Sequence, residues 1–489
     1  MQWTSREITQ AVGDAEKLRT ELLVVGIFAG GPLVGAARAV DRLTNGRLSG
    51  IVQRGELEDA PGATLLVQDL PGAAAVRILL VSLGKAQGFS DEAYRQALAA
   101  TARALAEGVA SEAVVTLVEN NVPGRSLAWS VQQAGRVLAD GNCRATLPGP
   151  KPSARNRQAL GVRRIMLLIP KTLTSELIGA LRRGMAVAEG LALAEDIGNL
   201  PADISPVAFL AGTISAMGEE LRFDVEVVER TTLKKLGMEA FLATGGTSAN
   251  HTRLTVMQYK GRRAKNRPIV LAGTGITFDM NGAGSVLGVL KAVARLRLSV
   301  NVVGLIAAAE NVREKNVDQP GEILTPMSGQ AIGIPDMNQL LLGDMLTYAE
   351  RLDPACVIDI ATSTGDVAAP GNRANDLFSN DCALAAELLK CGDDSGESAW
   401  RLRPWNDCPA QVRGNFVHTS DPRGRKPDTI AAVSLLGRFT KSYSWAHLNM
   451  ADRVSVAGQA KDDVDCPVPL LAEFLINRAT ESARQPKDF

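Results

Sequence analysis

The sequence is poor in histidine, a residue on which many zinc sites depend. His251, His418 and His447 are the three histidines among 489 residues, and none is paired at the short spacing of a zinc motif. The chain also lacks the Gly-x-Ser-x-Gly elbow and the Cys-His pattern of covalent hydrolases. These absences argue against a histidine-based zinc site and leave covalent peptidase chemistry without a candidate nucleophile.

Net charge, cysteine and long apolar runs are equally scarce. Lys plus Arg and Asp plus Glu number 53 each, so no overall field attracts polyanions or membranes. The N-terminal segment is polar, and the apolar run Leu22–Ala37 is broken by Gly-Gly-Pro, which argues against a signal peptide and a membrane span. We expect a cytoplasmic location without a membrane partner. Six scattered cysteines without a CxxC pair suit a reducing compartment and are expected to be free thiols: Cys143, Cys356, Cys382, Cys391, Cys408 and Cys466.

Short apolar runs rich in β-branched residues are plentiful, and they alternate with helical patterns. This alternation is typical of an α/β protein with largely parallel sheets. With 46% apolar residues, a chain of 489 residues can bury the cores of two domains. The first third is expected to contain strands at 22–28, 64–70, 77–83 and 165–169 and a helix at 91–107.

We place an N-terminal domain at residues 1–172, a linker helix at 173–196 and a C-terminal domain at 197–489. Ser205 followed by Pro206 forms a good N-cap and first-turn pair for a helix. Ligands of such α/β folds bind in loops at the carboxyl ends of the strands. The later elements are expected as strands at 269–273, 300–306 and 356–361 and helices at 286–296 and 339–351.

Several long strings carry a resemblance to a known family. They include LSGIVQRGELEDAPGATLLVQDLPG, LKKLGMEAFLATGGTSAN, PIVLAGTGITFDMNGAGSVLGVL and RFTKSYSWAHLNMA. Over nearly the whole chain, the sequence resembles the leucyl aminopeptidase family, the cytosol aminopeptidases that include bacterial aminopeptidase A. The resemblance implies a macro-like N-terminal α/β domain and a zinc-peptidase-like C-terminal α/β domain with a mixed, largely parallel sheet. It also implies a homohexamer and two divalent cations, zinc or manganese, in each active site.

The family's first ligand cluster is incomplete in this chain. The family reads Lys-Gly-x-Thr-Phe-Asp-Ser-Gly-Gly, continues through a second lysine and ends at a later aspartate. Here Thr274 stands at the first lysine position, and TFD runs directly into MNGAGSV, so Asp279 matches either aspartate. The residues between the two aspartates are missing, and with them the lysine that would polarise the scissile carbonyl.

The second cluster is reduced in the same way. The family signature Asn-Thr-Asp-Ala-Glu-Gly-Arg-Leu supplies an aspartate, a bridging glutamate and an arginine that positions a bicarbonate base. The matching segment, IPDMNQLLL, is shorter and keeps Asp336 alone of these carboxylates. Gln339 or its neighbour stands near the arginine position.

The number of remaining carboxylates indicates whether the site can bind two metal ions. Asp279 and Asp336 would supply two negative charges against the four positive charges of two divalent cations, which a buried site does not tolerate. We therefore expect no bound metal and no catalytic residue. Asp359, Asp366 and His447 could instead build a different metal site, but family geometry does not support it. We interpret His447 as a structural histidine whose hydrogen bonds are satisfied.

Two further motifs have alternative interpretations. GAGSVLG at Gly282–Gly288 superficially resembles a dinucleotide-binding loop, but the family has small residues there for close helix packing, which we favour. Thr274, Thr364 and Gly365 are remnants of the substrate cleft. They could bind peptide, although their retention for the fold alone is the simpler interpretation.

Basic clusters occur at 151–164, 260–267 and 423–426. Some bacterial members of the resembled family bind DNA without using their metals, but a basic loop is usually a solvated surface. We favour a catalytically inactive or severely impaired homologue with a structural or regulatory role in a hexamer, alone or mixed with an active paralogue. The alternatives are an aminopeptidase that removes N-terminal residues through a reduced metal site and a DNA-binding accessory protein.

Overall fold

The chain divides into two compact units, Met1–Glu189 and Gly190–Phe489, and the division falls within helix α6 (Ser175–Gly198). No helix in the described ranges is long and apolar enough to span a bilayer. The computed structural model describes residues 7–108, 110–140, 162–169, 172–200, 204, 206–244, 252–261, 266–277, 279–310, 323–324, 327–329, 332–333, 337–362, 374–402, 429–450 and 466–484.

A six-stranded sheet forms the centre of the first unit. All its neighbouring strands are parallel except the edge strand β3, which runs against β4. The inner strands are continuous apolar runs because both of their faces are covered. In spatial order the strands are β1 (Glu7–Val12), β6 (Arg164–Ile169), β5 (Glu112–Val115), β2 (Leu22–Ala29), β4 (Arg77–Lys85) and β3 (Thr64–Gln68).

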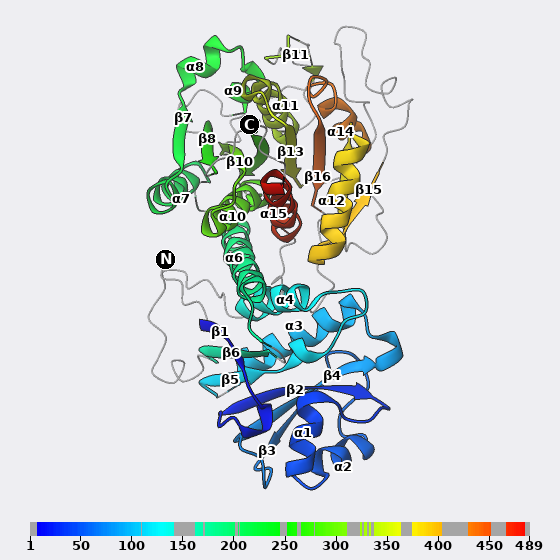
Figure 1. Cartoon of the computed structure of the whole chain (residues 1–489). Coiled ribbons are helices and arrows are strands. Elements are labelled where there is room, and N and C mark those ends of the chain that lie inside the picture. The colour runs from blue at the N-terminus through cyan, green and yellow to red at the C-terminus, as the bar shows by residue number, and fades with distance from the viewer. Residues whose placement is uncertain are drawn as a thin grey trace. The chain divides into compact units, whose positions relative to one another are not determined.

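Helices cover both faces of this sheet (Figure 1). One face packs against α3 (Asp91–Glu107), α4 (Leu127–Asp140) and the start of α6, around the fully buried Tyr94 and Leu98. The other face packs against α1 (Gly35–Leu43) and α2 (Arg47–Gln53). Three short 3-10 helices connect these elements: η1 (Ala15–Lys17), η2 (Ala86–Gly88) and η3 (Leu117–Glu119).

An eight-stranded mixed sheet forms the centre of the second unit. Its middle strands, from β16 to β10, are parallel, and the pairs β14 with β16, β10 with β8 and β8 with β7 are antiparallel. In spatial order the strands are β15 (Ala399–Arg401), β14 (Asn375–Ser379), β16 (Trp445–Asn449), β13 (Cys356–Ala361), β9 (Ile269–Ile276), β10 (Asn301–Ala309), β8 (Thr252–Lys260) and β7 (Asp224–Val228). A separate ribbon joins β11 (Ile323–Leu324) and β12 (Ile332–Gly333).

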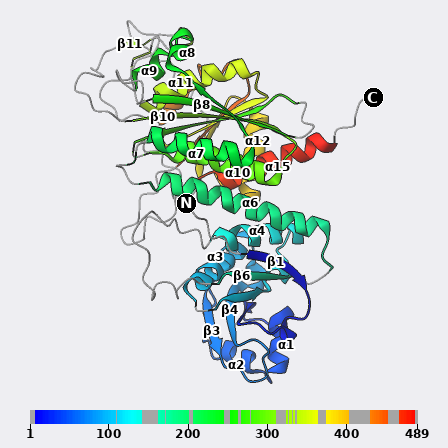
Figure 2. The same ribbon diagram turned by 90° about the vertical axis from the view of Figure 1, so that its left-hand side faces the viewer.

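Alternate residues of the central strands enter two different cores, so this unit has three layers. Figure 2 shows its sheet with α7 and α10 on one side and α9 and α11 on the other. The first core contains α7 (Pro206–Leu221), α10 (Asn281–Leu296), α12 (Cys382–Ser395), α15 (Val468–Arg484) and the end of α6. The second contains α8 (Arg230–Lys235), α9 (Glu239–Ala243), α11 (Met337–Ala349) and α14 (Thr429–Leu436), and η4 (Glu350–Leu352) follows α11.

The expected two-domain α/β fold with mixed, largely parallel sheets is confirmed. Helix α10 is longer than predicted, since it begins at Asn281 and contains the whole glycine motif. A Cβ atom on Gly288 would lie 2.4 Å from the carbonyl oxygen of Gly190, and one on Gly284 would lie 2.9 Å from that of Ala194. The glycines therefore let α6 and α10 pack backbone to backbone. They do not form a phosphate-binding loop, so the packing interpretation is the correct one.

Candidate functional site

Two of the predicted site residues, Thr274 and Asp279, lie at the carboxyl end of the central strand β9 in the second unit. Thr274 lies in β9, is 2% exposed and pairs with Ala307 of β10. Asp279 follows the end of β9, and Gln339 lies in the first turn of α11. Asp336, Thr364, Gly365 and Asp366 lie outside the described residues.

Asp279 belongs to a closed turn between β9 and α10. The backbone N–H of Ile276 donates to the carbonyl of Asp279 at 2.8 Å, and the N–H of Asp279 donates back at 2.9 Å. The Asp279 carboxylate accepts from the Thr362 hydroxyl at 3.3 Å and from the backbone N–H of Asn281 at 3.4 Å. This carboxylate therefore connects the start of α10 to the residue that follows β13.

The first turn of α10 lies directly on the strand ends. A Cβ atom on Gly282 would be 2.6 Å from the carbonyl oxygen of Ile360 and 2.9 Å from the backbone nitrogen of Thr274. Glycine is required at this close approach of helix to sheet. On this face, helix backbone fills the space beside β9 and β13.

Gln339 lies close to the second core. It is 9% exposed, and its Oε1 atom has no hydrogen-bond partner among the described residues. Leu340, Leu341 and Leu342 follow it and are buried in that core. A neutral amide in apolar surroundings cannot bind an anionic base as the family arginine would.

Helix α11 also carries a buried carboxyl group, whose hydrogen bonds stabilise the fold. Asp344 accepts the backbone N–H groups of Phe241 and Met327, each at 2.8 Å. Burial raises its pKa to about 6, although both hydrogen bonds act in the opposite direction. Asp344 thus ties α11 to α9 and to the residues after β11.

The described residues do not fit a two-ion centre. Nowhere among them do three or more His, Cys, Asp or Glu side chains gather where they could hold a metal ion. Asp279 brings one negative charge to the ends of β9 and β13, and Thr274 and Gln339 bring none. We therefore derive no catalytic step through a pair of metal ions.

A different polar group lies across three neighbouring strands. Asp359 of β13 and His447 of β16 are register partners, and the Asp359 Oδ1 atom is 2.5 Å from His447 Nδ1. Trp445 donates its indole N–H to the other Asp359 oxygen at 2.5 Å. The His447 Nε2 atom has no partner among the described residues, so the expectation of a fully satisfied histidine is wrong for this atom.

The same row continues to β14. Asp376 is 3% exposed and accepts from the Asn449 amide at 3.1 Å. Burial raises the pKa of Asp376, and the Asn449 hydrogen bond and the nearby His447 oppose that shift. Two members of this row could have been found from the sequence. Asp359 in VIDIA and His447 in WAHLN are polar residues in the middle of apolar strands.

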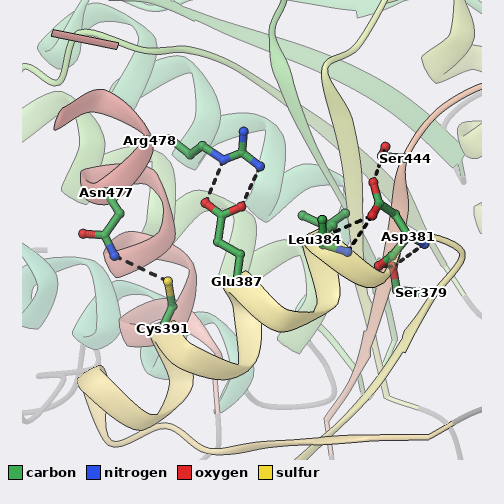
Figure 3. A network of polar contacts seen from close by, with 9 residues as sticks. Ser379, Asp381, Leu384, Glu387, Cys391, Ser444, Asn477 and Arg478 are labelled. Carbon is green, nitrogen blue, oxygen red and sulfur yellow. Dashed lines mark hydrogen bonds and ion pairs between the residues drawn. The ribbon is translucent and has the colours of Figure 1, made fainter. Parts of the chain in front are cut away.

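A second polar network joins α12 to α15 and is structural (Figure 3). Glu387 receives both guanidinium N–H bonds of Arg478, at 2.7 and 2.6 Å. Asp381 caps α12 by accepting from the N–H groups of Ala383 and Leu384. Burial raises the pKa of Cys391 to about 12, which keeps this thiol unreactive.

The described cysteines are free thiols, as the sequence predicts. The four cysteines in the described part of the chain, Cys356, Cys382, Cys391 and Cys466, are thiols and form no disulfide. Cys143 and Cys408 lie outside the described residues.

The two sheets and the helices that cover them define a two-unit α/β protein. The chain belongs to the cytosol aminopeptidase family. The family's catalytic-domain model matches residues 192–468, and its N-terminal-domain model matches residues 24–146. The resemblance drawn from the sequence motifs is therefore confirmed.

Curated relatives match over their full length. A "Probable cytosol aminopeptidase" of Azoarcus sp. (strain BH72) is 47% identical and aligns over 98% of this chain and 100% of its own. A protein with the same description from Aromatoleum aromaticum is 44% identical over 97% of this chain and 99% of its own.

Solved structures share the fold. The "Bottromycin maturation enzyme BotP" has a TM-score of 0.78 at 25% identity, covering 94% of this chain and 100% of its own. A mutant of tomato leucine aminopeptidase has a TM-score of 0.83 at 23% identity and covers 96% of each chain. BotP has also been solved in complex with Mn.

Proposed function

We propose that this chain is a non-hydrolytic member of the cytosol aminopeptidase family, with a structural or regulatory role. The supporting observation is the closed turn between Ile276 and Asp279, which joins β9 to α10 without a loop for further metal ligands. Asp279 uses its carboxylate to bind Thr362 and the start of α10.

Electrostatics support the proposal independently. Two divalent cations held close together need several carboxylates, because uncompensated charge is costly in a buried site. Asp279 and Asp336 offer two negative charges against four positive ones. Leu340–Leu342 make the neighbourhood of Gln339 apolar, which raises the cost further.

For the biological role, we propose assembly into a homohexamer in the cytoplasm, alone or together with an active paralogue. Full-length alignment with the Azoarcus relative supports retention of the whole scaffold. Native mass spectrometry of the protein purified from its source cell tests this assembly. A monomer contradicts the proposed assembly, and a hexamer that never contains a second peptidase chain limits it to the homohexamer.

Metal analysis combined with a leucine-amide hydrolysis assay tests the central proposal. The protein is dialysed against Mn²⁺ or Zn²⁺, passed through a desalting column and assayed beside the Azoarcus relative treated identically. We expect the relative to retain two ions per chain and to hydrolyse the amide. This chain should show no metal pair and no hydrolysis above buffer, and a retained pair with turnover would overturn the proposal.

The alternative is an active aminopeptidase with a reduced metal site, which the descriptions of the 47% and 44% identical relatives favour. On that hypothesis Asp279→Ala abolishes turnover measurable in the parent protein. Binding of peptide by a metal-free cleft at Thr274, Thr364 and Gly365 stays a prediction, and calorimetry with a leucine-containing peptide checks it.

DNA binding has weaker support. Two residues of the 260–267 basic cluster pair with carboxylates, Lys260 with Asp224 at 2.7 Å and Arg267 with Asp353 at 2.8 Å. Pairing reduces the positive charge that the cluster can offer to phosphates. A salt-dependent gel-shift assay, repeated after neutralisation of Arg262, Arg263 and Lys265, tests this function.

A further inference from the structure

The polar row across β13, β16 and β14 has two buried atoms without partners. His447 is 2% exposed and Asp376 is 3% exposed. The Nε2 atom of His447 and the Oδ1 atom of Asp376 both lack a hydrogen-bond partner among the described residues. Such groups are rare in folded proteins and call for a specific explanation.

Strand register brings these two side chains to the same face of the sheet. Phe378 pairs with His447 and Asp376 pairs with Asn449, so Asp376 is the diagonal neighbour of His447. Diagonal neighbours on antiparallel strands are roughly 7–8 Å apart at the backbone, a separation that an imidazole, a carboxylate and one ion between them can span. The His447 imidazole acts electrostatically on the Asp376 carboxyl group, which agrees with their proximity.

Both unpartnered atoms are acceptors. Asp359 accepts from His447 Nδ1 with one oxygen and from the Trp445 indole N–H with the other. A neutral imidazole that donates from Nδ1 carries its lone pair on Nε2. Asp376 Oδ1 is a carboxylate oxygen. Two acceptors without a donor are satisfied either by a cation or by a water molecule that donates to both.

Charge favours the cation. Asp359 and Asp376 are buried carboxylates, 0% and 3% exposed, and two buried negative charges are costly without a cation beside them. An imidazole held by a carboxylate at one nitrogen and open at the other is the usual arrangement of a metal-binding histidine. Imidazole and carboxylate ligands together suit zinc and neighbouring transition metals.

We propose that His447 Nε2 and Asp376 Oδ1 bind one divalent transition-metal cation, with Asp359 orienting the imidazole. Water completes the coordination, since no third His, Cys, Asp or Glu joins these ligands in the described structure. The site differs from the family's two-ion centre because it does not use Asp279, Asp336 or Gln339. It goes beyond the proposed function and does not depend on loss of hydrolysis.

Zn²⁺ binding by the chelator-treated full chain tests the site. Isothermal titration calorimetry should give one ion per chain for the parent protein. Asp376→Asn and His447→Asn should abolish this binding. Asparagine at 447 removes the Nε2 ligand, while its own amide can still donate to Asp359. Asp359→Asn should weaken binding by about 10–100-fold, as for other outer partners of metal-binding histidines.

Two control variants separate this site from other carboxylates. Asp279→Asn should leave Zn²⁺ binding unchanged, and so should Glu387→Gln on α12. Loss of binding in Asp279→Asn, with binding kept in His447→Asn, would assign the ion to the family site and overturn this proposal. The absence of Zn²⁺ binding by the parent protein would show that water alone occupies the position, which also overturns it.

A second measurement covers variants that fail to fold. Zinc X-ray absorption of the loaded parent protein should show one imidazole among oxygen ligands. A spectrum without imidazole, or with more than one, rules out the proposed ligand set. Thermal unfolding with and without Zn²⁺ should show ligand-dependent stabilisation in the parent protein, and its absence counts against the site.

Discussion

Ile276 and Asp279 exchange two backbone hydrogen bonds, of 2.8 and 2.9 Å, that close the turn between β9 and α10. The chain therefore passes from the end of β9 at Ile276 to the start of α10 at Asn281 within a few residues. On the proposed function, this short backbone connection leaves no room for further metal ligands, so replacing one side chain should not create a two-ion site. Substitutions at Thr274 and Asp279 should therefore change the stability of the fold and leave hydrolysis at background.

Restoring the family lysine at Thr274 should not restore hydrolysis. Thr274 is 2% exposed, and a lysine there would lose its hydration without a designed partner. We expect Thr274→Lys to lower the unfolding free energy by several kcal/mol, with its ammonium pKa depressed by burial. Denaturant unfolding and the leucine-amide assay measure both effects. Thr274→Val is the control, with a cost of about 1 kcal/mol.

Removing the Asp279 carboxylate should affect stability and leave hydrolysis at background. The substitution Asp279→Ala deletes the bonds to Thr362 and to the N–H of Asn281. Loss of such a helix-start interaction costs about 0.5–2 kcal/mol. Chemical denaturation checks the magnitude. Turnover in the parent protein that disappears in this variant would contradict our interpretation.

Much of the architecture could be predicted from the sequence, because buried parallel strands are continuous apolar runs. Strands β2, β4, β9 and β13 lie where such runs predicted them, and α7 begins at Pro206 as expected. The start of α10 could not be predicted, since glycine has low helix propensity. The close approach of α6 to α10, at Gly190 and Gly288, is a tertiary contact that overrides this propensity.

The candidate site was less predictable than the fold. Motif comparison located Asp279 and Thr274, but it could not show that Asp279 binds Thr362, because that contact depends on neighbouring parallel strands. Similarly, Asp359 and His447 are 88 positions apart in the sequence, and strand register alone brings them together. Local patterns do not encode register between distant parallel strands.

The packing of α6 against α10 can be tested with alanine at a glycine. A Cβ atom on residue 288 would lie 2.4 Å from the Gly190 oxygen, so Gly288→Ala should cost about 1–3 kcal/mol through overpacking. The matched control is Gly212→Ala on α7, where nothing lies within 4 Å of the added atom. Higher helix propensity should make that variant up to about 1 kcal/mol more stable. Equal effects of the two substitutions would contradict the packing argument.

The α12–α15 ion pair should contribute more to stability than an exposed pair. The Arg478 and Glu387 side chains are 39% and 24% exposed and form two parallel hydrogen bonds. We expect Glu387→Gln to cost about 1.5–3 kcal/mol. The control, Glu220→Gln, breaks the more exposed pair with Arg295 and should cost below about 1 kcal/mol. A double-mutant cycle isolates each coupling energy, and equal couplings would refute the difference.

Asp344 should make stability depend on pH in an unusual direction. Burial raises its pKa from 3.8 to about 6 in the folded chain, so the folded state binds a proton more tightly than the unfolded state. The stability contributed by this proton is fully present below the unfolded pKa. It is lost as pH rises through about 4 to 6, by on the order of 2–3 kcal/mol.

The variant Asp344→Asn isolates this effect from that of other carboxyl groups. Asparagine cannot ionise, but it offers one acceptor oxygen where the N–H groups of Phe241 and Met327 both donate, so the variant should be less stable at pH 4. Urea unfolding of both proteins from pH 4 to 7 measures the difference. Only the parent protein loses a proton from this side chain, so the difference in unfolding free energy between parent and variant should shrink as pH rises. An advantage that grows with pH would mean that the two N–H bonds outweigh burial and hold the pKa of Asp344 low.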